Sequence, residues 1–239
     1  DGMRYELFIA LKYIISRKRQ TFLSVGAIGI AVMMIVVSQA FMAGFTEELY
    51  DKTVDELPHV TISPYDKDDY IHLYKNLITK VNGIEGVAGI SPYLVGEASL
   101  KYRDTTQNVI LKGIIPDRES EVSRIDRDVV KGSFSELKYN DNSIVIGDDL
   151  LSKLDANLGD SIDASFPDAN PVSLEIIGVY DTGRADDQSL TYTSLKTAQE
   201  FYGTSDVVNG ISLRINDVNN DREIAEDIQE MGYDASGWT

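Results

Sequence analysis

Residues Thr21 to Phe45 read TFLSVGAIGIAVMMIVVSQAFMAGF, a run of 25 residues without a charged side chain. A helix rises about 1.5 Å per residue, so this run would span roughly 37 Å, and the hydrocarbon core of a bilayer is about 30 Å thick. We therefore predict a transmembrane helix over residues 21–45. Most of the chain follows this run, which predicts one membrane helix near the N-terminus and a large domain on one side of the membrane.

Basic residues predict which side of the membrane each part occupies. Arg17, Lys18 and Arg19 directly precede the apolar run, whereas acidic residues follow it. Because positive residues are retained on the cytoplasmic side, we expect residues 1–20 to form a cytoplasmic or interfacial segment of a cell (cytoplasmic) membrane protein. The main domain is then extracytoplasmic. A cleaved signal peptide is the alternative, but its apolar region is typically only about 7–15 residues long.

The charge of the chain excludes one class of partner. The formal net charge is −17, and the first 46 residues hold five basic and two acidic side chains, so the other 17 basic and 37 acidic side chains give residues 47–239 a charge of −20. Such a domain repels the phosphate backbone, so we expect no nucleic-acid partner. The chain has no cysteine, which excludes disulfides and thiolate metal ligands.

The charged segment after the apolar run is predicted to be helical as well. Residues 46–57 (TEELYDKTVDEL) contain neither Gly nor Pro and precede Pro58, which disfavours helix in the residue before it. We predict a helical stalk over 46–57 that carries movement of the membrane helix outward, since Gly or Pro would absorb such movement. A passive connector is the alternative. The residues that we assign to mechanical coupling are Phe45, Glu48, Leu49, Lys52 and Leu57.

The outer end of the apolar run is a candidate interface. Phe41, Met42 and Gly44 lie there, and we expect them to line a dimer interface or a lateral entry for lipid. Small residues earlier in the run, such as Gly26 and Gly29, allow close packing of helices. Plain membrane anchoring would tolerate the same residues.

The outer domain begins and ends with similar patterns. Residues 59–63 alternate like a strand, residues 66–81 have the spacing of an amphipathic helix, and residues 87–102 are predicted to be extended, with breaks at Pro92 and Gly96. Near the other end, residues 210–215 are predicted to form a strand, and a helix is expected from Asn219 or Asn220 to Met231, with Gly232 ending it. Two such halves can pair as one α+β layer.

The middle of the chain has the pattern of short strands. Turn residues separate several of them, as at Gly159-Asp160. The predicted strands are 108–115, 143–146, 161–166, 172–180 and 188–193, and the predicted helices are 148–154 and 194–202. We therefore expect an α+β exterior with two lobes: a discontinuous porter-like lobe of residues 58–101 and 208–239, and an inserted β-rich lobe of residues 102–207.

Motifs of common catalysts are absent or incomplete. The phosphate-binding pattern G-x-x-x-x-G-K-[ST] does not occur, so this chain is not expected to be an ATPase. Asp181-Thr182-Gly183 spells the tripeptide of aspartic proteases, but those enzymes need two such carboxylates and the sequence has no second copy. We predict a turn there and assign no catalytic or cofactor-binding residue.

Candidate metal ligands are also better explained by structure. Asp66, Asp68 and Asp69 resemble the start of a calcium loop, yet later positions of that loop do not match, and a helix N-terminus accounts for their charge. His59 and His72 have no clustered ligands, and we expect them at the surface or at a cap. Asp186 and Asp187 are expected in a solvated loop. We assign no metal site.

The order of these segments resembles a known family, the ABC-transporter permeases of the MacB/FtsX/LolC–LolE superfamily, closest to the lipoprotein-releasing LolE/LolC branch. No single motif is strict, and the ordered set carries the resemblance. The matching pieces are Phe8–Tyr13 with Ser16–Arg19, Phe41–Phe45, Pro58–Val60, Ile144–Gly147 with Leu150 and Leu154, Gly159-Asp160, Ile176–Tyr180, Ser194–Lys196 with Ala198-Gln199, and Trp238.

The resemblance implies a fold, partners and a substrate. It implies a MacB-like extracytoplasmic domain, a cytoplasmic ABC ATPase as a separate subunit, a homologous permease subunit in a homo- or heterodimer, and a membrane lipid, lipoprotein or other amphiphilic substrate. Family members have four membrane helices, so we expect the sequence to be part of a longer protein. The loop Phe166 to Val172 is shorter than the family's carrier-binding hook, which favours a LolE-like role or a cell without an outer membrane. An FtsX-like scaffold that activates an outer hydrolase and a single-pass anchored binding module are the alternatives.

Overall fold

The computed structural model describes residues 6, 12, 17–56, 58–65, 69–217 and 220–237. The chain divides into two compact units, residues 1–52 and residues 53–239. Several predicted features lie outside the described residues: the motif before Arg17 apart from Lys12, the stalk residue Leu57, the aspartates 66 and 68, Asn219 and Trp238.

The apolar run forms the predicted helix. Helix α2 (Lys18–Glu56) is 39 residues long and includes both the 21–45 run and residues 46–56 of the predicted stalk. Its segment Arg19–Thr46 is long and apolar enough to cross a membrane, and an 18-residue stretch within it has a mean hydropathy of 2.3. The helical prediction for these residues is confirmed, whereas the mechanical role of residues 46–57 stays a prediction.

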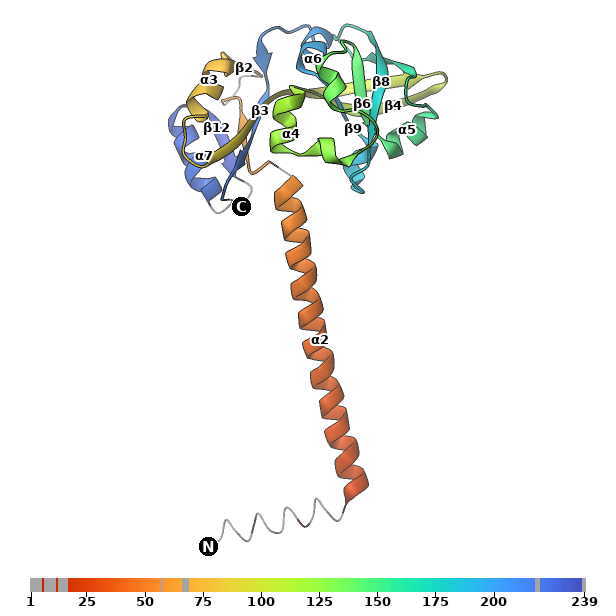
Figure 1. Cartoon of the computed structure of the whole chain (residues 1–239), viewed down its shortest axis with the longest axis vertical. Coiled ribbons are helices and arrows are strands. Elements are labelled where there is room, and N and C mark those ends of the chain that lie inside the picture. Colours follow the sequence, from red (N-terminus) through yellow and green to blue (C-terminus); the bar gives the residue numbers. More distant parts are fainter. Residues whose placement is uncertain are drawn as a thin grey trace. The chain divides into compact units, whose positions relative to one another are not determined.

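The described part of the second unit contains a sheet of ten strands (Figure 1). Its strands are β1 (Val60–Ser63), β3 (Val87–Tyr102), β4 (Thr105–Ile114), β5 (Val129–Gly132), β6 (Ser143–Gly147), β7 (Ser161–Ser165), β8 (Val172–Tyr180), β9 (Leu190–Ser194), β11 (Gly210–Ile215) and β12 (Asp234–Gly237). Their order is β12-β1-β11-β3-β4-β9-β6-β8-β5, and β7 pairs with both β3 and β8. Residues 166–171 connect β7 to β8 directly, as the sequence predicts.

Strand β3 is continuous, so the predicted breaks at Pro92 and Gly96 are wrong. Pro92 has no backbone N–H to donate to a neighbouring strand. On the β11 side, however, the bonded residue is Tyr93, whose carbonyl accepts from the Asn209 N–H. Pro92 therefore faces the other edge, where pairing with β4 begins only at Tyr93 and Ile114. Gly96 is required for another reason: a Cβ there would lie 2.7 Å from the Tyr202 ring.

One predicted helix begins later than its spacing suggested. Helix α3 (Tyr74–Val81) starts after Leu73, which has a left-handed backbone with φ 54°. Ile71 and His72 instead form β2 (Ile71–His72), which pairs with β10 (Val207–Val208) in a separate two-stranded sheet. Pairing with a distant segment thus overrides the helical pattern of the preceding residues.

The remaining helices are α4 (Pro116–Val122), α5 (Asp148–Leu154), α6 (Leu195–Phe201) and α7 (Asp221–Glu230). Helices α5, α6 and α7 match the predictions. Gly232 follows α7 with φ +90°, as expected for a residue that ends a helix. Helix α4 and the strands β5 and β12 were not predicted. The signal for α4 was Pro116, which occupies the first turn, where its missing N–H does no harm.

Buried apolar side chains form separate cores along the sheet. The first core lies around α3, α7, β1 and β11, and includes Leu77, Leu213 and Ile228. The second core lies around α5, β6, β7 and β8, and includes Leu100, Ile146 and Leu174. Figure 1 shows α3, α7 and β12 at one end of this domain and β4, β8 and α5 at the other, with β3 passing between them. The lobe boundaries near 102 and 207 stay a prediction.

Candidate functional site

The outer end of α2 presents an exposed aromatic face. Phe41 and Phe45 are one helical turn apart, and their rings are stacked with centroids 6.1 Å apart. Met42 is 64% exposed, and a Cβ on Gly44 would meet nothing within 4 Å. Within the described part of the chain, no residue in the most apolar stretch of this helix is buried. These side chains are available to lipid or to another helix.

The basic residues at the start of α2 lie where a helix disfavours positive charge. Cations are disfavoured at a helix N-terminus, where the backbone N–H groups already carry partial positive charge. Arg17 is exposed, and its guanidinium donates to the Gln20 side chain over 3.4 Å. Lys18 begins the helix and Arg19 follows it. This placement agrees with a role of these residues in setting the orientation of the helix in the membrane. The cytoplasmic location of the N-terminus stays a prediction.

The predicted stalk residues fall into two groups. Phe45, Glu48, Leu49 and Lys52 belong to α2, and its segment after Phe45 contains neither Gly nor Pro up to Glu56. Leu57 lies outside the described residues. The backbone is therefore continuous helix for nearly the whole predicted stalk, which is the property that transmission of movement requires.

The chain enters the outer domain through a buried histidine. His59 is only 4% exposed, and its backbone N–H donates to the Leu213 carbonyl over 2.8 Å. Its Nδ1 lies 3.1 Å from the carbonyl oxygen and 3.2 Å from the amide nitrogen of Ile215. The expectation of a surface or cap role is therefore wrong for His59, because β11 covers it, whereas His72 is exposed as expected. These bonds tie the first residues after Pro58 to β11.

A buried ion pair lies where α4 packs on β3 and β4. Glu119 is fully buried; Ser91 Oγ donates to its Oε2 over 2.6 Å, and Lys112 Nζ donates to its Oε1 over 2.7 Å. Lys112 Nζ also lies 4.7 Å from the Tyr93 ring centre. Burial, and secondly the charge of Glu119, raise the pKa of Tyr93. Sequence reasoning missed this group, because its four residues come from three separate segments.

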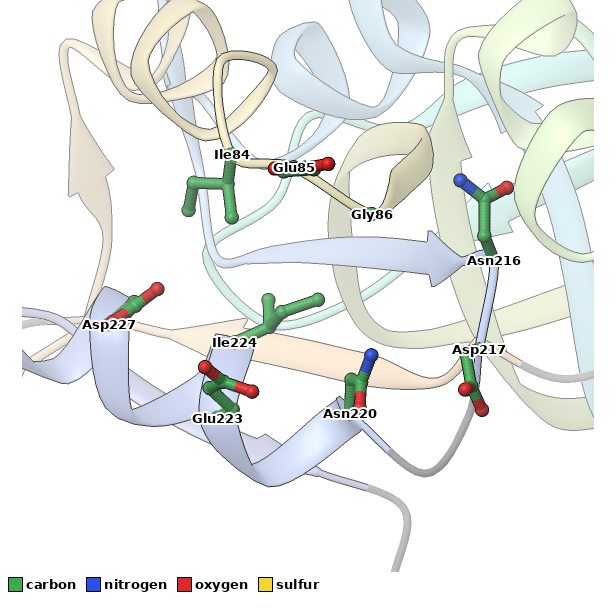
Figure 2. Close-up of a pocket in the computed structure, with 9 residues that line it drawn as sticks. All are labelled: Ile84, Glu85, Gly86, Asn216, Asp217, Asn220, Glu223, Ile224 and Asp227. Carbon is green, nitrogen blue, oxygen red and sulfur yellow. The ribbon is translucent and has the colours of Figure 1, made fainter.

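One pocket of the outer domain is acidic. It has a volume of about 530 Å³ and lies between α7, the end of β11 and the turn after α3. Figure 2 shows Glu223, Asp227 and Asn220 on one side and Ile84, Glu85 and Gly86 on the other, with Asn216 and Asp217 at one end. Within the described ranges, no three His, Cys, Asp or Glu side chains come close enough together to hold a metal ion. The carboxylates in this pocket are therefore spread around its walls.

The protease-like tripeptide forms a turn, as predicted. Gly183 has φ +68°, and its N–H donates to the Asp181 side chain over 2.9 Å. The expectation of a solvated loop is wrong for Asp187, which is 3% exposed. Its carboxylate accepts from the backbone N–H and the hydroxyl of Thr182 over 2.7 and 2.6 Å. Asp187 therefore holds this turn in place, and two acceptor bonds compensate for its burial.

The helix and the sheet-rich domain match a described family. The model of the MacB-like periplasmic core domain matches residues 21–231, which is most of the chain. The chain belongs to this family. In this MacB-like chain the match covers both the apolar helix from Thr21 onward and the outer domain up to the end of α7. The chain is accordingly a membrane protein with an outer domain of the periplasmic core type.

Several curated proteins are similar to this MacB-like chain over most of its length. The lipoprotein-releasing system transmembrane protein LolC of Xylella fastidiosa is 25% identical over 97% of the chain, and LolC of Neisseria meningitidis is 25% identical over 90%. LolE of Haemophilus influenzae is 24% identical over 97%. The chain spans only 60%, 55% and 61% of the lengths of these relatives, respectively.

Solved structures show the same fold. The extracellular domain of the ABC-type transporter YknZ from Gram-positive bacteria has a TM-score of 0.55 at 16% identity, and the alignment covers 75% of this chain and 99% of that one. The periplasmic region of MacB from Actinobacillus actinomycetemcomitans has a TM-score of 0.56 at 12% identity, with 77% and 90% covered. The expected α+β, MacB-like architecture is confirmed.

Proposed function

We propose that this chain is part of the permease subunit of an ABC transporter that moves a lipoprotein or another amphiphilic substrate out of the outer leaflet. The observation that carries the proposal is the similarity to LolC and LolE proteins over 97% of the chain, covering helix and outer domain together. A shared outer domain alone would support only a shared fold.

The proposed mechanism is mechanical. The sequence lacks a phosphate-binding loop, so ATP would be hydrolysed by a separate cytoplasmic subunit and the movement transmitted through the membrane. The basic residues at Arg17 to Arg19 would hold the N-terminus in the cytoplasm. Helix α2 would then carry the movement to Glu56, and His59 would pass it to β11 through its buried bonds.

The outer end of α2 is the proposed contact for lipid or for a second permease subunit. Phe41 and Phe45 form one apolar patch with Met42, and all three are more than half exposed, at 72%, 51% and 64%. Lipid tails are as apolar as these side chains, so the hydrophobic effect does not favour burying the patch against another helix. Close packing therefore decides whether a helix binds there. The small side chain of Gly44 in the same turn permits that packing.

The test is purification of the native protein from detergent-solubilised membranes, followed by mass spectrometry of the proteins that accompany it. We expect an ATPase with a phosphate-binding loop, together with lipidated proteins. Recovery of an ATPase with a cell-wall hydrolase would support an FtsX-like scaffold instead. Recovery without any ATPase would contradict the proposal and leave an anchored binding module.

A further inference from the structure

One edge of β3 has a gap between its neighbouring strands. Pairing with β11 extends along this edge to Tyr93 and Gly210, and pairing with β7 begins at Ser99 and Ser165. Within the described ranges, no strand pairs with residues 94–98 on this edge. The gap lies between the cores, because Leu94 belongs to the first core and Ala98 to the second. An unpaired stretch of this kind is where a sheet bends most easily.

The side chain of Asn209 fills the first part of the gap. Its Nδ2 donates to the Val95 carbonyl over 2.6 Å, and its Oδ1 accepts from the Val95 N–H over 2.8 Å. The backbone N–H of Asn209 also donates to the Tyr93 carbonyl over 3.2 Å. The amide side chain of Asn209 therefore extends the hydrogen-bond ladder by one residue beyond Gly210, where β11 begins. Both backbone groups of Val95 are thereby satisfied.

The side chain of Tyr202 fills the next part. Its hydroxyl donates to the Glu97 carbonyl over 3.0 Å, and its ring lies so close to Gly96 that a Cβ there would be 2.7 Å away. Tyr202 is half-buried and packs against both cores. Helix α6, which precedes it, places Ala198 in the first core and Phe201 in the second. The ring is therefore held by contacts on either side of the gap.

We propose that Asn209 and Tyr202 form a clamp that closes the edge of β3 and joins the first core to the second as one rigid body. Movement delivered to the first core then reaches the second without bending at residues 94–98. The buried bonds of Glu119 with Ser91 and Lys112 strengthen the same region, because they tie α4 to β3 and β4. This proposal concerns the outer domain alone, so it can fail without affecting the proposed function.

The absence of native cysteine makes the test direct, because spin labels can be placed without removing any residue. Lys80→Cys on α3 and Ser152→Cys on α5 put one label beside each core, at exposed positions. The distance distribution between the labels is measured by pulsed electron paramagnetic resonance on the whole chain in lipid nanodiscs. The test variant combines Asn209→Ala with Tyr202→Phe. The control is Asn140→Ala, which removes only a local 3.3 Å bond to Glu136.

We expect one narrow distance distribution for the native background and for the control, and a clearly broader one for the double variant. A broad or bimodal distribution in the native background would overturn the proposal. A double variant as narrow as the control would overturn the assignment to Asn209 and Tyr202.

Hydrogen exchange provides a second measurement on folded protein. The Val95 amide should exchange about fivefold faster in Asn209→Ala, because one hydrogen bond is worth roughly 1 kcal/mol and about 1.4 kcal/mol corresponds to a factor of ten. It should be unchanged in Asn140→Ala. Equal exchange in the two variants would contradict the clamp.

Discussion

Replacing Lys112 by Met should destabilise the outer domain strongly. Lys112 reaches Glu119 over 2.7 Å, and the side chains of the two residues are 15% and 0% exposed. Without the ammonium group, the Glu119 carboxylate would keep only the Ser91 hydroxyl as a described partner. A buried charge with one neutral donor has lost most of the interaction that compensated for its removal from water.

The expected size of the effect follows from that burial. Breaking a buried pair by removing one partner typically costs about 3–5 kcal/mol, and a whole domain is stable by only about 5–15 kcal/mol. Replacing both partners, as in Lys112→Met with Glu119→Leu, should recover most of the loss, since two apolar side chains can fill the same space. Glu119→Gln should be milder, because its amide oxygen still accepts from Ser91.

The assay is urea unfolding of the detergent-solubilised chain, with circular dichroism as the readout. The matched control is Lys138→Met, which breaks the ion pair between Lys138 and Asp117 at the surface, where the side chains are 47% and 56% exposed. Exposed ion pairs contribute little to stability, so this control should unfold almost like the native chain. If Lys112→Met costs no more than Lys138→Met, or if the double variant is the least stable, the reasoning about Glu119 is refuted.

Three further changes have definite expected outcomes. The hydrogen bond from Tyr102 (2.7 Å) lowers the pKa of Asp160 from its ordinary 3.8, so the stability contributed by this carboxylate is present above pH 3.8 and is lost as the pH falls through the lowered value. Carbon NMR titration should show that low pKa and its rise in Tyr102→Phe; an equal pKa in both proteins would be contrary to this account. Gly113→Ala would bring a Cβ within 2.2 Å of the Ala198 Cβ, and the strain should cost about 1–3 kcal/mol in urea unfolding. An unchanged midpoint would show that the contact relaxes freely. Inserting Gly-Gly after Asp51 should leave ATP turnover in the assembled transporter but abolish transport, and normal transport would exclude a stalk role for this part of α2.

Local signals predicted some elements well. The observed bounds of β6 and α5 agree closely with the predicted ones. The apolar residues of this strand are consecutive, and Gly147 followed by Asp148 marks the start of the helix. The α2 helix was equally predictable, since hydropathy and the lack of Gly or Pro after Phe45 depend on neighbouring residues only.

Contacts between distant segments explain what the sequence did not predict. Ile71 has helical spacing with its neighbours, but it pairs with Val208 across the chain. Glu119 and His59 are polar residues in buried positions, which hydropathy assigns to the surface. Asn209 lies where β11 and β3 stop pairing, so its role depends on two strands that are far apart in the sequence. No pattern around that asparagine distinguishes it from one in an ordinary turn.

The most direct test of a permease that moves an amphiphilic substrate is the ATP turnover of the purified transporter in lipid nanodiscs. Turnover is measured with a lipoprotein carrying its acyl chains and with the same protein lacking them. We predict that the acylated form raises turnover and the unacylated form does not. Equal turnover with both forms would contradict recognition of an amphiphilic substrate, and a complete lack of ATP hydrolysis in the purified assembly would contradict the transporter itself.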